Sequence, residues 1–255
     1  MALPLHLSFG ACGFLGIYHL GVAAGLYAHG AGLLCDVRGY AGASGGALVA
    51  AVLLTAPEQL EACTRFAHSL AEDARQQPLG AATPSFHLLE RLRAGLDQIL
   101  PAHAHVLAQG RLYVSLTAVN TFQNRLVSQF PTHEDLVQVL LASCFVPIYS
   151  GLKPVEFQGQ DWADGALSCS LPLPPGGRTL TVSPFCGRHD ISPCDPGRGL
   201  GSCVHVTGQD VEISTANVAR LARALFPPSR ARLESLHHDG FCDAVSFLRR
   251  EGRFW

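Results

Sequence analysis

The chain has 255 residues, of which 48% are hydrophobic and only 15% are charged. A charged fraction this far below the usual quarter excludes disorder as the main state and predicts a large buried core, in one domain or two small ones. The net charge of −2 provides no basic field for a nucleic-acid backbone, so we expect no nucleic-acid partner.

The first half of the chain alternates predicted strands and helices. Apolar runs at 3–9 and 35–41 predict two strands, and each is followed by a turn of small residues and then by a helix, at 17–29 and 47–54. This alternation is typical of the α/β class. We therefore expect a three-layer α/β/α domain around a mostly parallel central sheet.

Capping boxes that begin at Thr55 and Thr132 predict two more helices, which extend to about residues 75 and 143. A hairpin is predicted at 155–162, with its turn at Gly159. The remaining predicted elements are strands at 111–120, 126–130 and 178–183 and helices at 86–100, 218–225 and 243–250.

The chain shows no domain boundary and no repeat. We expect a single domain over 1–255, with a motif-bearing core at about 3–175 and a C-terminal helical part at about 205–255. Residues 187–201 are rich in Gly, Pro, Cys and Asp and predict a long loop.

Two charge-free stretches, 1–35 and 39–57, raise the alternative of an integral membrane protein. Seven glycines interrupt the first stretch, and the second contains a glycine-rich turn, so buried core elements are the favoured interpretation and no transmembrane segment is expected. A basic leader region and an Arg-rich transit peptide are both missing, which argues against a targeting peptide.

The nine cysteines are odd in number, widely spaced and without a CxxC pair. This pattern predicts neither a zinc site nor a disulfide framework, and it favours reduced thiols in an intracellular compartment. Cys12 and Cys144 are interpreted as small buried side chains and not as nucleophiles.

The sharpest local motif is the G-x-S-x-G string Gly42-Ala43-Ser44-Gly45-Gly46, which lies between a predicted strand and a predicted helix. A serine on such a sharp turn projects from the edge of the sheet, and the flanking glycines allow the backbone to bend where a Cβ would clash. Ser44 is therefore a candidate nucleophile. The alternative is a turn of small residues that only packs a strand against a helix.

A second motif is the glycine-rich turn from Gly10 to Gly16, directly after the first predicted strand. Consecutive backbone N–H groups at such a turn can hold an oxyanion. They can also hold a dinucleotide pyrophosphate, and Asp36 has the spacing of a ribose-binding acid. That fingerprint is incomplete because Ala11 occupies a glycine position.

The third motif is Asp164-Gly165-Ala166. Asp-Gly is commonly a turn, but a carboxylate near Ser44 could also accept the hydroxyl proton as a general base. A histidine-containing triad is the alternative, and its histidine would come from the positions after Asp164, which are His189, His205, His237 and His238.

These three motifs in this order resemble the patatin-like phospholipases, and the resemblance spans nearly the whole chain. The strings at 12–21 and 141–147 are similar to the vertebrate branch of that family. The resemblance implies a Ser–Asp dyad, with Ser44 as nucleophile and Asp164 as base. It implies an oxyanion hole from the amides around Cys12, Gly13 and Phe14, and motif roles for Gly16, Gly42, Gly46, Gly165 and Ala166.

Two positions depart from the family pattern. Ala11 replaces a glycine, which a methyl group tolerates if the local φ is negative. Ser170, two residues before Pro172, stands where the family tends to have asparagine. The first could alter the anion-binding turn and the second the positioning of the aspartate loop.

The resemblance implies hydrolysis of a lipid ester through an acyl-serine, with triacylglycerols, phospholipids and retinyl esters as substrates and acyl transfer as a side reaction. It implies no metal and no organic cofactor. We expect peripheral contact with a lipid surface, through loops at 76–85 or 145–152, in a cytosolic protein at a membrane or lipid droplet; the organelle, mitochondrion included, stays open. The alternative function is a decayed lipid-binding or scaffold protein of the same fold.

Overall fold

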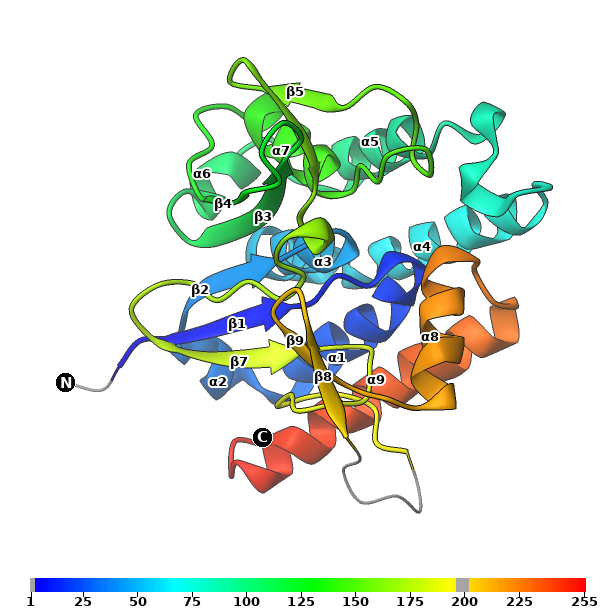
Figure 1. The fold of residues 1–255 in the computed structure, drawn as a ribbon. Helices are drawn as coiled ribbons and strands as arrows, with labels where there is room; N and C mark the ends of the chain where they lie inside the picture. The colour runs from blue at the N-terminus through cyan, green and yellow to red at the C-terminus, as the bar shows by residue number, and fades with distance from the viewer. Residues whose placement is uncertain (1–2, 196–201) are drawn as a thin grey trace.

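A computed structural model of the protein describes residues 3–195 and 202–255. Within these residues the main sheet has seven strands, in the order β5-β6-β3-β2-β1-β7, with β4 paired to β3 (Figure 1). Strands β3, β2, β1 and β7 run parallel to one another. Strands β4 and β6 pair antiparallel with β3, and β5 pairs antiparallel with β6. The expected α/β class, a mostly parallel sheet flanked by helices, is confirmed. The strands are β1 (Leu5–Phe9), β2 (Val37–Gly42), β3 (Leu112–Ala118), β4 (Asn124–Val127), β5 (Val155–Phe157), β6 (Gln160–Asp164) and β7 (Arg178–Val182).

The central strands are buried on both faces, which explains their continuous apolar runs. In β1, Leu7 and Phe9 are fully buried. Helix α3 packs against β1, β2 and β3, and the small residues at the end of β2 permit its close approach. The glycine-rich turns between strands and helices thus lie at the carboxyl ends of the parallel strands.

The helices are α1 (Gly16–His29), α2 (Ala31–Asp36), α3 (Gly45–Thr55), α4 (Leu60–Arg75), α5 (Leu88–Ile99), α6 (Ala104–Ala108), α7 (His133–Ser143), α8 (Thr215–Leu225) and α9 (Arg230–Arg250), and single 3₁₀ turns lie at Gly13–Leu15, Pro57–Gln59, Gly80–Ala82, Pro84–Phe86 and Gly165–Leu167.

Helix α9 lies along α1, so that segments from the two ends of the described chain pack side by side (Figure 1). Glycines make the contact close: a Cβ at Gly21 would lie 2.0 Å from the carbonyl oxygen of His237, and one at Gly240 would lie 2.2 Å from that of Tyr18. The Tyr18 hydroxyl also donates a hydrogen bond to Asp243 (2.7 Å). The helix predicted at 243–250 covers only the C-terminal part of α9. Leu233 and Leu236 continue the buried face at helical spacing, and Gly240 interrupts the apolar pattern between the two parts.

Two helix and strand predictions need correction. The capping box at Thr55 is wrong: Thr55 is the last residue of α3, and its hydroxyl donates to the carbonyl of Ala51 (2.8 Å) within that helix. The second strand was predicted from residue 35, but Cys35 and Asp36 end α2 and the strand begins at Val37.

The second predicted capping box is confirmed at Thr132, where the hydroxyl accepts the N–H of Asp135 and the Asp135 carboxylate accepts the N–H of Thr132. The hairpin at 155–162 is also confirmed, with Gly159 at φ +73° in its turn. The helix predicted at 86–100 is found as α5, and the helix predicted at 218–225 as α8.

Residues near 205, where the helical part was expected to begin, form a hairpin of β8 (Cys203–Val206) and β9 (Gln209–Glu212). Thr207 and Gly208 both have positive φ, the geometry of a two-residue hairpin turn. Within the predicted loop at 187–201, the described part (187–195) forms only isolated bridges, and 196–201 lie outside the described residues. In the described parts of the chain, no helix has the length and apolar character needed to cross a bilayer.

Candidate active site

Ser44 occupies a strained backbone position between β2 and α3. Its φ of 55° and ψ of −134° are values that a residue with a side chain rarely adopts. A Cβ at Gly42 would lie 2.5 Å from the N–H nitrogen of Ala47, and one at Gly46 would lie 2.4 Å from the carbonyl oxygen of Phe9. The flanking glycines are therefore required for this strand-to-helix turn, as the motif predicts.

Ser143, at the end of α7, holds the backbone of this turn. Its Oγ accepts a hydrogen bond from the N–H of Ser44 (2.9 Å) and donates one to the carbonyl of Ser115 in β3 (2.9 Å). Sequence reasoning assigned no role to Ser143. The only available signal was its place in the 141–147 string shared with the vertebrate family branch.

Asp164, the last residue of β6, is brought to Ser44 and is buried. Its Oδ1 accepts the N–H of Ala166 (2.8 Å), and Asp164 lines the same cavity as Ser44. Burial raises the pKa of Asp164 to about 6, and the Ser44 side chain and the N–H of Ala166 oppose that rise. Gly165 is required beside it, since a Cβ there would lie 2.3 Å from the carbonyl oxygen of Ser115.

The glycine-rich turn lies against the Ser44 turn. A Cβ at Gly45 would lie 2.7 Å from the sulfur of Cys12 and 3.2 Å from the carbonyl oxygen of Gly13. Gly13 has φ +51°, and a Cβ there would lie 2.2 Å from the carbonyl oxygen of Ala224 in α8. The turn continues into α1 through Gly16.

One cavity of about 530 Å³ brings the predicted groups together. Cys12, Gly13 and Phe14 line it from the glycine-rich turn, Ser44 from the elbow and Asp164 from the end of β6. The rest of its lining is mostly apolar and includes residues of α3, α4, α5, α8, the segment 144–150 and the β8–β9 hairpin. A serine hydroxyl, a buried carboxylate and a backbone turn thus share a space suited to an apolar ligand.

The family model of the patatin-like phospholipases matches residues 7–175. The chain belongs to the patatin-like phospholipase family. It is 55% identical over 250 residues to human patatin-like phospholipase domain-containing protein 4, covering 98% of each chain. It is 39% identical to human patatin-like phospholipase domain-containing protein 2, over 97% of this chain and 49% of that one. It is also 39% identical to a human 1-acylglycerol-3-phosphate O-acyltransferase, over 96% of this chain and 51% of that one.

The first departure from the patatin-like pattern leaves the turn intact. Ala11 has a negative φ, so its methyl group causes no backbone strain, and its N–H donates to the carbonyl of Ser170 (2.7 Å). This contact joins the glycine-rich turn to the chain that follows Asp164.

The second departure, Ser170, is itself hydrogen-bonded. Its Oγ donates to the carbonyl of Thr207 (3.0 Å) and accepts from the side chain of Gln209 (2.7 Å), which in turn accepts from Ser183 (2.8 Å). Gln209 was not predicted as a site residue. These bonds fix the β8–β9 hairpin beside the chain that follows Asp164.

No histidine is among the described residues that line the cavity with Ser44 and Asp164. Of the four candidates for a triad, His205 is exposed on β8 and contacts Asp210 (2.9 Å), and His189, His237 and His238 also lie outside the lining. The geometry therefore favours a dyad over a histidine-containing triad.

The nucleotide-binding alternative fails on strand register. Phe9 pairs with Gly42 at the carboxyl ends of β1 and β2, where the glycine-rich turn begins, whereas Asp36 precedes Val37 at the opposite ends. The Asp36 carboxylate forms an ion pair with Arg253 there. A ribose-binding acid would have to lie at the same edge as the turn.

The two cysteines near the site have the character expected from the sequence. Cys12 and Cys144 are both buried, and burial is the main cause that raises the pKa of each thiol well above its usual range. They remain protonated thiols at neutral pH and are therefore poor nucleophiles.

Proposed function

We propose that this patatin-like protein hydrolyses ester bonds of lipids through a dyad of Ser44 and Asp164. The observation that carries the proposal is that the strained Ser44 turn and the buried Asp164 line the same mostly apolar cavity. Strain at a polar residue in a cavity is typical of a functional site.

In the proposed first step, the Ser44 Oγ attacks the ester carbonyl carbon while Asp164 takes the hydroxyl proton. The backbone N–H groups around Cys12, Gly13 and Phe14 stabilise the oxyanion. The proton then passes to the leaving oxygen, an alcohol departs, and an acyl-serine remains. Water attacks the acyl carbon, Asp164 takes its proton and returns it to Ser44, and a fatty acid is released.

The environment of Asp164 suits this role. With a pKa of about 6, the carboxylate is ionised at neutral pH and is still a stronger base than an exposed aspartate. The Ser143 hydrogen bond supports the role of Ser44 because it keeps the turn in its strained geometry. Gly16, Gly42, Gly46, Gly165 and Ala166 contribute backbone geometry to the same arrangement.

The apolar lining supports lipid esters as the substrate class, with triacylglycerols, phospholipids and retinyl esters as the specific candidates. Relatives from human and mouse are named as acyltransferases. An acceptor hydroxyl could replace water in the second step, so acyl transfer is proposed as a side reaction.

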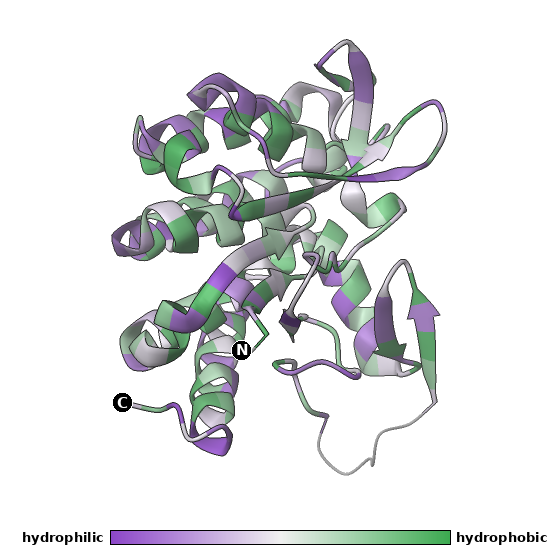
Figure 2. Ribbon diagram, turned by 90° about the vertical axis from the view of Figure 1, so that its left-hand side faces the viewer, coloured by the Kyte–Doolittle hydropathy of each residue, from purple (hydrophilic) through white to green (hydrophobic). Residues whose placement is uncertain are grey.

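We also propose that the face around the cavity opening contacts the lipid surface. Helix α8 carries exposed apolar side chains, with Val218 69% and Leu221 56% exposed, and both residues line the cavity. Figure 2 colours the ribbon by hydropathy and shows that helices of the protein carry both hydrophobic and hydrophilic residues. Ile148 and Leu152 are exposed in the predicted contact loop 145–152, and Leu79 is exposed in the loop 76–85. A protein partner on the α8 face would obstruct the opening, whereas a lipid surface would supply the substrate.

The contact is tested by flotation with phosphatidylcholine vesicles. We expect Leu221→Glu to lower the bound fraction severalfold. Val106→Glu on α6, at an equally exposed position outside the cavity lining, should leave it unchanged. Equal binding by the wild type and both variants would refute this contact face.

The dyad is tested by turnover of p-nitrophenyl butyrate and of a triolein emulsion. We expect Ser44→Ala and Asp164→Asn each to lose about a thousandfold or more in kcat/KM. Wild-type turnover no faster than that of the variants on either substrate would favour the alternative, a lipid-binding protein with a decayed site.

A further inference from the structure

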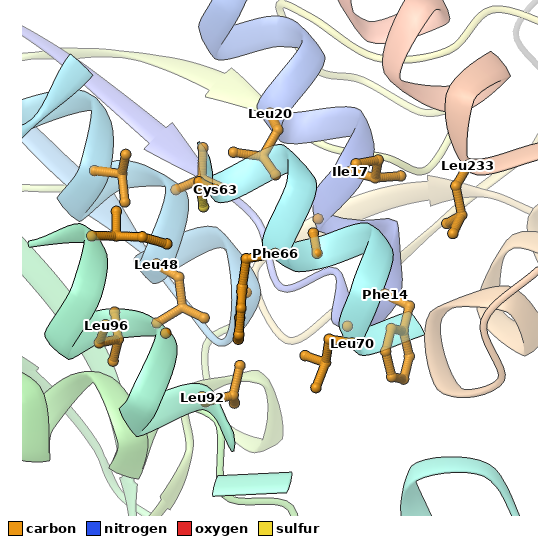
Figure 3. Close-up of a pocket in the computed structure, with 18 residues that line it drawn as sticks. Phe14, Ile17, Leu20, Leu48, Cys63, Phe66, Leu70, Leu92, Leu96 and Leu233 are labelled. Atoms are coloured by element: carbon orange, nitrogen blue, oxygen red, sulfur yellow. The ribbon is translucent and has the colours of Figure 1, made fainter. Parts of the chain in front are cut away.

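A second, smaller cavity of about 100 Å³ lies behind the Ser44 turn, between α1, α3, α4 and α5 (Figure 3). Its lining is apolar, and Figure 3 shows the ring of Phe66 in the middle of the leucine side chains. Cys63 adds the one sulfhydryl group, and burial raises the pKa of this thiol to about 12. Apolar cavities of about 150 Å³ stay dry and bind small hydrocarbons, so this space suits a short hydrocarbon segment.

The two cavities share part of their walls. Gly45, the residue after Ser44, lines both, and so do Phe14, Leu48, Leu70 and Leu92. Phe14 and Leu48 are only partly buried. Gly13 also lines both cavities, so the wall that they share consists of apolar side chains and glycine backbone.

Phe66 and Gly95 set the depth of the smaller cavity. A Cβ at Gly95 would lie 2.5 Å from Cζ of Phe66, so the ring rests directly on the backbone of α5. Neither residue lines the larger cavity. The ring thus closes the far part of the space that a chain from Ser44 could enter.

We propose that the smaller cavity receives the distal methylene groups of the acyl chain carried by Ser44 and so determines which chain lengths are preferred. This inference rests on the proposed ester hydrolysis and assigns a fatty-acyl subsite to it. Each methylene group buried there strengthens binding about fourfold. The protein therefore prefers acyl chains that reach past Leu48 to Phe66 over short chains that end in the larger cavity.

Two variants change the smaller cavity in opposite directions. Ala67 on α4 lines only this cavity, so Ala67→Leu fills it, whereas Phe66→Ala enlarges it. Ala62→Leu is the matched control, because Ala62 is a half-buried residue of the same helix that lines neither cavity. The readout is the ratio of kcat/KM for p-nitrophenyl laurate to that for p-nitrophenyl butyrate, and an unfolding effect lowers both values together.

We expect the laurate-to-butyrate ratio to fall about tenfold in Ala67→Leu and to stay unchanged in Ala62→Leu. In Phe66→Ala, the preference should shift toward p-nitrophenyl palmitate. An unchanged ratio in both Ala67→Leu and Phe66→Ala, with butyrate still cleaved, would overturn the subsite.

A binding measurement separates this subsite from the proposed hydrolysis. Calorimetric titration of the Ser44→Ala protein with laurate needs no turnover, and adding Ala67→Leu should weaken laurate binding about tenfold. If the wild type shows no Ser44-dependent hydrolysis, the proposed function fails while the laurate titration still decides the subsite. If Ala67→Leu leaves the affinity for laurate unchanged, the proposed subsite is wrong.

Discussion

The hydroxyl of Ser143 accepts the backbone N–H of Ser44 and donates to the carbonyl of Ser115. One side chain therefore connects the end of α7, the strained turn and the neighbouring strand β3. Because Ser143 is fully buried, no water can replace these bonds when the hydroxyl is removed.

We predict that Ser143→Ala lowers kcat/KM for p-nitrophenyl butyrate at least tenfold and destabilises the fold by about 1–3 kcal/mol, because the N–H of Ser44 loses its partner. The rate of fluorophosphonate labelling of Ser44 should fall with it. Ser69→Ala on the exposed face of α4 is the control and should change neither value. If Ser143→Ala keeps the wild-type labelling rate and activity, the Ser44 turn keeps its geometry without the Ser143 hydrogen bond.

The pH dependence of turnover should follow Asp164. The base must be ionised, so kcat/KM is expected to fall as the pH drops through about 6, the pKa to which burial raises this carboxyl. A pH profile of p-nitrophenyl butyrate hydrolysis from pH 4 to 9 measures it. A profile that stays flat down to pH 4.5 would contradict the raised pKa or the role of Asp164 as base.

The same raised pKa predicts that Asp164→Asn stabilises the protein at pH 8. The pKa of Asp164 is about 6 in the fold against 3.8 in the unfolded chain, so the carboxyl favours folding below pH 3.8 and loses that contribution as the pH rises through 6. The ionised carboxylate therefore costs about 3 kcal/mol at pH 8, which a neutral amide avoids.

Thermal unfolding of both proteins at pH 8 and pH 4 checks this. The variant should unfold at the higher temperature at pH 8, and the difference should shrink toward pH 4. A less stable Asp164→Asn protein at pH 8 would show that the carboxylate makes compensating contacts as an ion.

The contact between α1 and α9 predicts a glycine-dependent stability. Gly240→Ala places a methyl group 2.2 Å from the carbonyl oxygen of Tyr18, so the helices must separate, at a cost of about 1–3 kcal/mol or more. Gly32→Ala is the control, because its nearest neighbour is 3.4 Å away on the Trp255 side chain. Urea unfolding curves for both variants test this. Equal unfolding midpoints for the two variants would mean that α9 moves away from α1 without a loss of folding free energy.

Sequence reasoning predicts the parts of this site whose requirements are local. The Ser44 turn and the Asp164 loop need glycines at neighbouring positions, and such needs are visible in a short string. The partners that depend on distant chain segments were missed. Ser143 reaches Ser44 across 99 residues, and Gln209 reaches Ser170 across 39, with no periodicity to reveal either contact.

The errors in the fold have similar causes. The predicted start of β2 at Cys35 was two residues too early, because an apolar cysteine is compatible both with the start of a strand and with the end of a helix. The N-terminal half of α9 was missed although Leu233 and Leu236 are spaced as on one helix face, because Gly240 interrupts that face and makes its buried contact without a side chain. Helix propensity and apolar spacing carry no signal for such a contact.

The pairing of α1 with α9 also constrains when the chain can complete its core. Helix α1 ends at His29 and α9 begins at Arg230, so about 200 residues must be synthesised between them. At about 5–20 residues per second, synthesis of α9 begins roughly 10–40 seconds after synthesis of α1 ends, and until then the face of α1 that carries Gly21 has no α9 to pack against. During that interval the nascent chain exposes Tyr18 and its neighbours, and it is then a natural client for chaperones that bind apolar segments.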